Sequence, residues 1–133
     1  MIVSLDATAV EAAKSYAKKE SGDFEVLGLF LGNDELLDNF VEIDNLASNP
    51  ESTYLAHPQQ LFDALKNTSI IDPNSDTQVM FFHSHPKWKA YPSLADKLGA
   101  GFVGYYSIYS LIDDELNVFY FDGKDFSEKK CTY

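Results

Sequence analysis

The 133-residue sequence predicts an α/β protein in which helices pack on a β-sheet. Apolar runs of strand length at residues 24–32 and 77–83 are typical of buried strands, and segments with helical apolar spacing alternate with them. Two further apolar runs near the C-terminus, separated by a short acidic turn, predict a hairpin. No repeat, low-complexity run or linker interrupts this pattern, so we expect one domain over residues 1–133.

The first third of the chain predicts an extended segment, a helix and two strands. Asp6 is a suitable N-cap for a helix that runs to about Glu20, and Ser21-Gly22-Asp23 should end it. One face of this helix is apolar and should be buried, with Val10, Ala13, Tyr16 and Ala17. The extended segment covers residues 1–5, and the two strands cover residues 24–32 and 37–46.

The middle of the chain predicts a polar loop, a second helix and a buried strand. Residues 47–53 are polar, contain a proline and should form the loop. Pro58 suits the first turn of a helix over residues 58–66, whose inward side chains should be Leu61, Phe62 and Leu65. After a turn-rich stretch at residues 71–76, the strand at 77–83 delivers two histidines at its C-terminal end.

The last third predicts a short helix and a hairpin. A loop at residues 87–92 precedes the helix, which should cover residues 93–100. The hairpin strands are expected at 105–112 and 115–121, across Asp113-Asp114, and a final strand at 126–132.

Composition excludes several classes of function. A formal net charge of −11 argues against binding to nucleic acid or to an anionic membrane, since both require a basic surface. The single cysteine, Cys131, cannot form an intramolecular disulfide and has no evident activating partner, so it is a poor nucleophile and suits a reducing compartment. No secretory signal or membrane span is recognisable, and we expect a cytoplasmic location.

Three side chains form a candidate metal site. His83 and His85 are two residues apart, so in a strand they point to the same face. Asp96 follows eleven residues after His85, which is far enough for the chain to turn back. Two imidazoles and one carboxylate are the ligands of a catalytic zinc that keeps a fourth position for water.

Each part of this constellation also has a plain structural interpretation. Either histidine alone could be a core residue, and Ser93 with Asp96 could be only a helix cap, although capping and a role in the site are compatible for Ser93. A hydrolase further needs a base, and Glu25 is a candidate because it opens an apolar strand; its alternative is an exposed strand start. Large barrel hydrolases need about 250 residues, and nucleobase deaminases need a Pro-Cys-x-x-Cys, so both are excluded.

Glu25 followed by Gly28 and Gly32, then His83-Ser84-His85, seven residues, Ser93, two residues and Asp96, resembles the JAMM (MPN-plus, JAB/Mov34) zinc metalloprotease family in its short prokaryotic form. The resemblance implies a mixed, curved β-sheet flanked by helices, the MPN or cytidine-deaminase-like core. It implies Zn²⁺ ligated by His83, His85 and Asp96. It also implies that Glu25 activates the water and that Ser93 stabilises the oxyanion.

The resemblance further implies an isopeptidase or peptidase that cleaves after the C-terminal glycines of a ubiquitin-like or sulfur-carrier-like protein with a Gly-Gly tail. Two alternatives stay open: a non-catalytic MPN-type interaction module, and a zinc hydrolase of a carrier-bound amino acid or small amide. Residues 49–54 and the segment after His85 are candidate groove walls. Trp88 and Tyr91 either dock a partner or cover the site, His57 is expected near a helix cap and not as a ligand, and a homodimer is compatible with the sequence.

Overall fold

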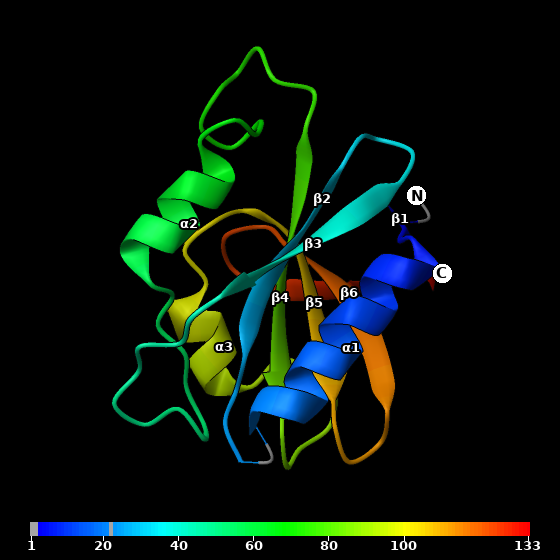
Figure 1. The fold of residues 1–133 in the computed structure, drawn as a ribbon. Coiled ribbons are helices and arrows are strands. Elements are labelled where there is room, and N and C mark those ends of the chain that lie inside the picture. The colour runs from blue at the N-terminus through cyan, green and yellow to red at the C-terminus, as the bar shows by residue number, and fades with distance from the viewer. Residues whose placement is uncertain (1–2, 22) are drawn as a thin grey trace.

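The computed structural model describes residues 3–21 and 23–133 and confirms the α/β prediction (Figure 1). One mixed sheet has the strand order β3-β2-β4-β5-β6-β7, and within it β4 and β5 are parallel while the other neighbouring pairs are antiparallel. Its strands are β2 (Leu27–Gly32), β3 (Leu37–Ile43), β4 (Gln78–His85), β5 (Gly104–Ser110), β6 (Glu115–Phe121) and β7 (Phe126–Lys129). A second, two-stranded parallel sheet joins β1 (Val3–Ser4) to β8 (Cys131–Thr132).

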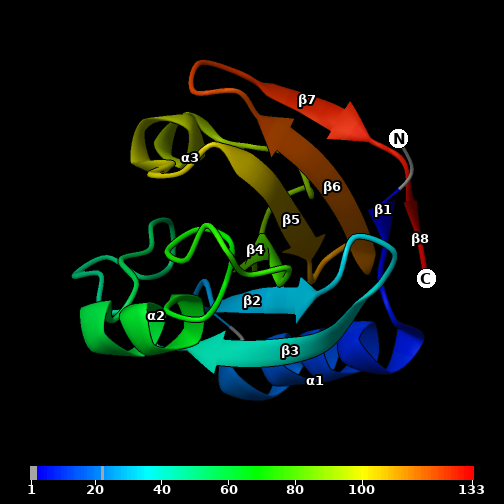
Figure 2. The same ribbon diagram turned by 90° about the horizontal axis from the view of Figure 1, so that it is seen from above.

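Helices cover both faces of the main sheet. In Figure 1, α1 (Ala7–Ser21) lies on one side of the sheet, and α2 (Pro58–Leu65) and α3 (Leu94–Gly99) lie on the other. Side chains alternate along the central strands, so Phe30 of β2 and Met80 of β4 pack with the α1 face, whereas Leu29 packs with α2. Figure 2 shows the twist of the sheet between the β2–β3 end and the β6–β7 end. Because side chains alternate along β4 as well, only every second residue of this strand can face α3.

The predicted apolar faces of the helices are largely confirmed. Val10, Ala13 and Ala17 of α1 are buried in the core. In α2, Leu65 is buried and Leu61 partly buried, but the prediction for Phe62 was wrong, because this side chain is 52% exposed. Phe62 directly follows Leu61 and therefore lies about 100° away from it around the helix. Ala64, three residues after Leu61, faces the core instead.

Several strand boundaries differ from the predictions. β2 begins at Leu27 rather than at residue 24, because the backbone N–H of Glu25 donates to Pro50 in a loop and not to a neighbouring strand. β3 ends at Ile43, where the chain enters the loop that leads to α2. The predicted last strand is two strands, since β7 pairs with β6 and β8 leaves to pair with β1.

Some predictions fall on residues that the structure leaves out. Residues 1–2 of the expected extended segment and Gly22 of the expected helix end lie outside the described residues. Over residues 3–21 and 23–133, no helix is both long enough and apolar enough to cross a membrane.

Candidate metal centre

Strand β4 places two histidines side by side. His83 and His85 both point to the face that α2 and α3 cover, and both are buried. The strand continues through His85, two residues beyond its predicted end, because β5 pairs with it in parallel as far as His85 and Ser110. The Nε2 atoms of the two rings are 3.3 Å apart. The histidines therefore converge on one point from a rigid element.

A capping box on α3 places Asp96 at the same point. The backbone N–H of Ser93 donates to Asp96 Oδ2 at 2.9 Å, and the N–H of Asp96 donates to Ser93 Oγ at 3.1 Å. Asp96 Oδ1 lies 3.1 Å from His83 Nε2, and Oδ2 lies 3.1 Å from His85 Nε2. The cap interpretation is confirmed, and the cap itself aims the carboxylate at the two imidazoles.

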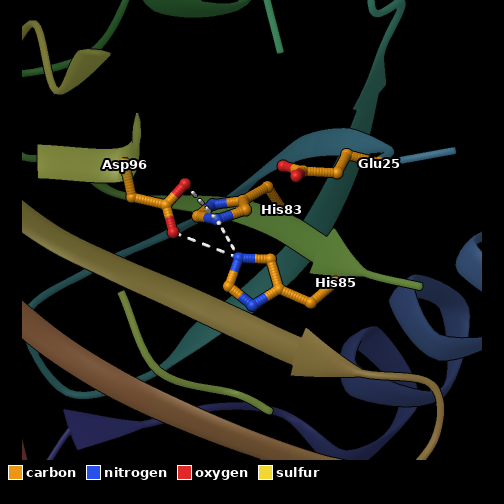
Figure 3. Close-up of side chains that lie close together, drawn as sticks. All are labelled: Glu25, His83, His85 and Asp96. Atoms are coloured by element: carbon orange, nitrogen blue, oxygen red, sulfur yellow. Dashed lines mark hydrogen bonds and ion pairs between the residues drawn. The ribbon is translucent and has the colours of Figure 1, made fainter. Parts of the chain in front are cut away.

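Glu25 completes the cluster from the segment before β2 (Figure 3). Ser84 holds this segment on β4, because its Oγ accepts from the N–H of Val26 at 3.0 Å and its own N–H donates to the Val26 carbonyl at 3.1 Å. Glu25 is only 5% exposed, which excludes the alternative of an exposed strand start. Its Oε1 is buried without a hydrogen-bond partner among the described residues.

The arrangement shifts the pKa of each carboxyl in a different direction. Burial, and secondarily the negative charge of Asp96, raises the pKa of Glu25 to about 8, although His85 opposes this. Burial would also raise the pKa of Asp96, but the charge of His83 and the hydrogen bonds from His83, His85 and the Ser93 backbone hold it well below the usual value. In the metal-free chain, Asp96 is therefore ionised near neutral pH, whereas Glu25 keeps its proton.

The donor atoms fit a divalent cation. One ligand atom from each of Glu25, His83, His85 and Asp96 can be chosen so that all lie within 4.8 Å of one another. His85 Nδ1 lies 2.6 Å from the Lys89 carbonyl, which can only accept, so Nδ1 carries a proton and Nε2 is the nitrogen that faces the cluster and can ligate a cation when the ring is neutral. Burial alone would lower the pKa of His85, but its bonds to Asp96 and Lys89 raise it above the usual value. A cation would satisfy the converging nitrogens and the orphaned Oε1 together.

Two clefts reach the cluster. The first has a volume of about 230 Å³ and is lined by Glu25, Glu51, Ser52, His85, Pro86, Lys87, Trp88 and Ser93. The second has a volume of about 350 Å³ and is lined by Thr53, Tyr54, Ala95, Asp96, Leu98 and Gly99. A larger apolar groove of about 360 Å³ adjoins His83 and also includes Tyr54. The loop at residues 51–54 thus borders all of them.

The other predicted residues lie around the cluster. Trp88 is 47% exposed with its ring 5.5 Å from His85, whereas Tyr91 is 42% exposed and packs against Phe119. His57 caps α2 by accepting from the N–H of Gln60 and takes no part in the cluster, as predicted. Cys131 also stays outside it, and burial raises the pKa of its thiol to about 11.

Sequence reasoning missed the roles of two neighbours of the histidines. Ser84 was only a spacer in the motif, yet it is fully buried and holds the Glu25 segment. The sequence did indicate a buried role for Ser84, because this residue follows Met80 and Phe82 on a face of the strand that is otherwise apolar. The Lys89 carbonyl that orients His85 had no signal, since it is a backbone group.

Comparisons with known proteins agree with this geometry. The sequence model of prokaryotic homologs of the JAB domain matches residues 7–115. A curated protein, desampylase of Haloferax volcanii, is 28% identical over 131 residues, which cover 95% of this chain and 92% of that protein.

Solved structures share the fold. A solution structure from Desulfitobacterium hafniense superposes with a TM-score of 0.80 at 23% identity, covering 99% of this chain and 92% of the other. A JAB1/MPN-domain protein from Archaeoglobus fulgidus gives a TM-score of 0.58 at 15% identity over 98% and 97% of the two chains. A structure described as a JAMM metalloprotease-like zinc site in the proteasome and signalosome gives 0.53 at 16% identity over the whole of both chains. The sheet and helices are therefore those of an MPN fold.

Proposed function

Because this chain belongs to the family of prokaryotic homologs of the JAB domain, we propose that it is a zinc-dependent isopeptidase or peptidase. Its substrate would be a ubiquitin-like or sulfur-carrier-like protein, cut after the C-terminal glycines. The observation that carries this proposal is the buried convergence of Glu25, His83, His85 and Asp96. The similarity to desampylase along most of both chains supports a ubiquitin-like substrate.

His83, His85 and Asp96 would hold the ion through their Nε2 atoms and a carboxylate oxygen. Two imidazoles and one carboxylate form a ligand set that suits zinc and leaves a position open. When bound, Zn²⁺ would act as a Lewis acid that polarises the scissile carbonyl and makes a water molecule acidic.

Glu25 would carry the proton between reactants. Its Oε1 has no hydrogen-bond partner in the described chain, and it lies beside His85 at the wall of a cleft that a leaving group can enter. Burial favours the protonated form of this carboxyl and a neighbouring cation favours its ionised form, so the group can both accept and donate a proton. Glu25 would take the proton of the attacking water and give it to the leaving amine.

Ser93 would stabilise the negative oxygen that forms on the substrate. Its Oγ already accepts from the Asp96 N–H, which leaves the hydroxyl hydrogen able to donate. The side chain lines the same cleft as Glu25. A donor aimed at developing charge in a buried site supplies a large share of catalysis in acyl transfer.

The second cleft suits an extended glycine tail. Thr53 and Tyr54 form one wall and Ala95 and Leu98 of α3 form the other, next to Asp96. Glycines have no Cβ, so their backbone can approach the ion closely in a narrow groove. We place Trp88 at the other cleft, beside the leaving group.

We further propose that residues 1–133 act as one domain, since a single core cluster joins Val10 of α1 to Phe30, Met80, Tyr109 and Val118 of four strands. The lone cysteine supports a reducing compartment such as the cytoplasm.

Metal analysis and a substrate panel test the proposal. We expect about one zinc per chain, and cleavage of a linear or isopeptide-linked Gly-Gly fusion that a chelator abolishes and zinc restores. The Glu25→Gln variant should keep zinc and lose cleavage. Small amides and carrier-bound amino acids in the same panel distinguish the alternative hydrolase, and zinc-loaded protein that cuts nothing would support a non-catalytic module.

A further inference from the structure

Asn45 follows β3 and makes hydrogen bonds with every polar atom of its side chain. Its Nδ2 donates to the carbonyls of Glu25 at 2.9 Å and Thr53 at 3.1 Å. Its Oδ1 accepts from the N–H groups of Ala47 at 3.0 Å and Leu55 at 2.9 Å. A primary amide has two N–H donors and two acceptor sites, so all four are used, and the partners fix which way the amide faces.

These bonds join Glu25 to the loop that follows Asn45. The same loop holds the other backbone group of Glu25, because the Pro50 carbonyl accepts from the Glu25 N–H at 2.7 Å. Both backbone polar groups of Glu25 are therefore bound to residues 45–50. The position of its carboxylate depends on this attachment as well as on β4.

The bonds of Asn45 also bracket Tyr54. Thr53 and Leu55 are the residues on either side of it, and the Tyr54 ring packs 4.7 Å from the ring of His83. Tyr54 lines the cleft that reaches Asp96, and this is the cleft in which the glycine tail of the substrate is proposed to lie. One amide thus connects the segment that carries the carboxylate to the wall of the substrate cleft.

We propose, resting on the function proposed above, that Asn45 is a positioning residue that sets Glu25 in register with the cleft wall at Tyr54. It acts through Glu25 and the loop. It makes no hydrogen bond with the two histidines or with Asp96 in the described chain. Its loss should disturb the alignment of the carboxylate with the substrate and leave the metal in place.

The Asn45→Asp variant tests this with little change of shape. It keeps an oxygen for Ala47 and Leu55 but removes the N–H groups that bind Glu25 and Thr53. We expect kcat to fall about 10- to 100-fold, as misplacement of a reacting group by about 1 Å does, with a smaller change in KM. Zinc content, and quenching of the single tryptophan, Trp88, by Co²⁺, should match the wild type.

Asn33→Asp is the matched control. Asn33 lies in the turn between β2 and β3, and its Oδ1 accepts from the N–H groups of Glu35 and Leu36. The exchange keeps these acceptor bonds, so kcat should stay within about twofold. If Asn45→Asp does not fold, Asn45→Ser avoids the buried carboxylate and carries the same expectations.

Hydrogen exchange measured by NMR judges the positioning independently of activity. The Glu25 amide donates to Pro50, so its exchange reports whether the loop still holds Glu25. We expect at least tenfold faster exchange of this amide in Asn45→Asp and no change in Asn33→Asp. If the wild type cuts no substrate, the proposed function fails while this measurement still decides the role of Asn45.

Two results would overturn the inference. One is an unchanged exchange rate of the Glu25 amide together with an unchanged kcat in Asn45→Asp. The other is loss of metal in parallel with loss of activity, which would indicate a general structural role.

Discussion

The Glu25→Gln variant should stabilise the metal-free protein at alkaline pH but not at acid pH. Unfolded, Glu25 releases its proton near pH 4.5, whereas in the folded chain burial and Asp96 raise its pKa to about 8. Between these values the unfolded state binds fewer protons, so the stability of the metal-free wild type falls as the pH rises. Glutamine has nearly the same shape and no charge to bury, so the variant escapes this loss.

The size of the effect follows from the pKa. A shift from 4.5 to about 8 corresponds to at most about 5 kcal/mol between the two protonation states, at about 1.4 kcal/mol for each pKa unit. We expect the variant to exceed the wild type by about 3 kcal/mol at pH 8, or roughly 10 °C in Tm for a chain of this size, and by little at pH 5. Other titrating groups are common to both proteins and cancel in the difference.

The assay is thermal or urea unfolding of chelator-treated wild type and variant at pH 5 and pH 8, repeated with excess zinc. Zinc should remove the advantage of the variant, because a bound cation favours the ionised form of Glu25 and stabilises the state that binds it. A difference in stability that does not depend on pH would refute the reasoning. So would a metal-free wild type that is the more stable protein at pH 8.

Three further changes have expected outcomes. Asp96→Asn should lower zinc affinity at least 100-fold in calorimetric titration, because it removes a charged ligand that contacts both imidazoles; full zinc retention would contradict this. Ser93→Ala should cost about 1 kcal/mol of stability through the lost cap and about 100-fold in kcat with zinc retained, whereas an unchanged kcat would leave Ser93 only as a cap. Gly28→Ala should cost about 1–3 kcal/mol in urea unfolding, because its Cβ would lie 2.8 Å from the Val41 carbonyl oxygen and contact the Phe40 ring, and an unchanged midpoint would show that the sheet relaxes there.

Most of the elements could be predicted because their signals are local. Helical spacing in α1 and the apolar run of β4 depend on neighbours within a few residues, and both elements were found. The errors occur where a distant partner decides the outcome. The chain leaves the sheet after β7 because β8 pairs with β1 at the other end of the sequence, and no local pattern indicates that.

The spacing of His83, His85, Ser93 and Asp96 by itself determined a strand that presents two imidazoles and a capped helix that returns a carboxylate, because side-chain alternation and capping act over short distances. Only the tertiary structure decided that Glu25 joins them. The antiparallel register that pairs Leu27 with His83, extended by two residues, brings Glu25 opposite His85, and long-range pairing of this kind has no local signature. The same packing buries Glu25 and holds its segment in place, since Ser84 accepts from the N–H of Val26 and Asn45 donates to the Glu25 carbonyl, and burial is what raises the pKa of the Glu25 carboxyl in the metal-free chain.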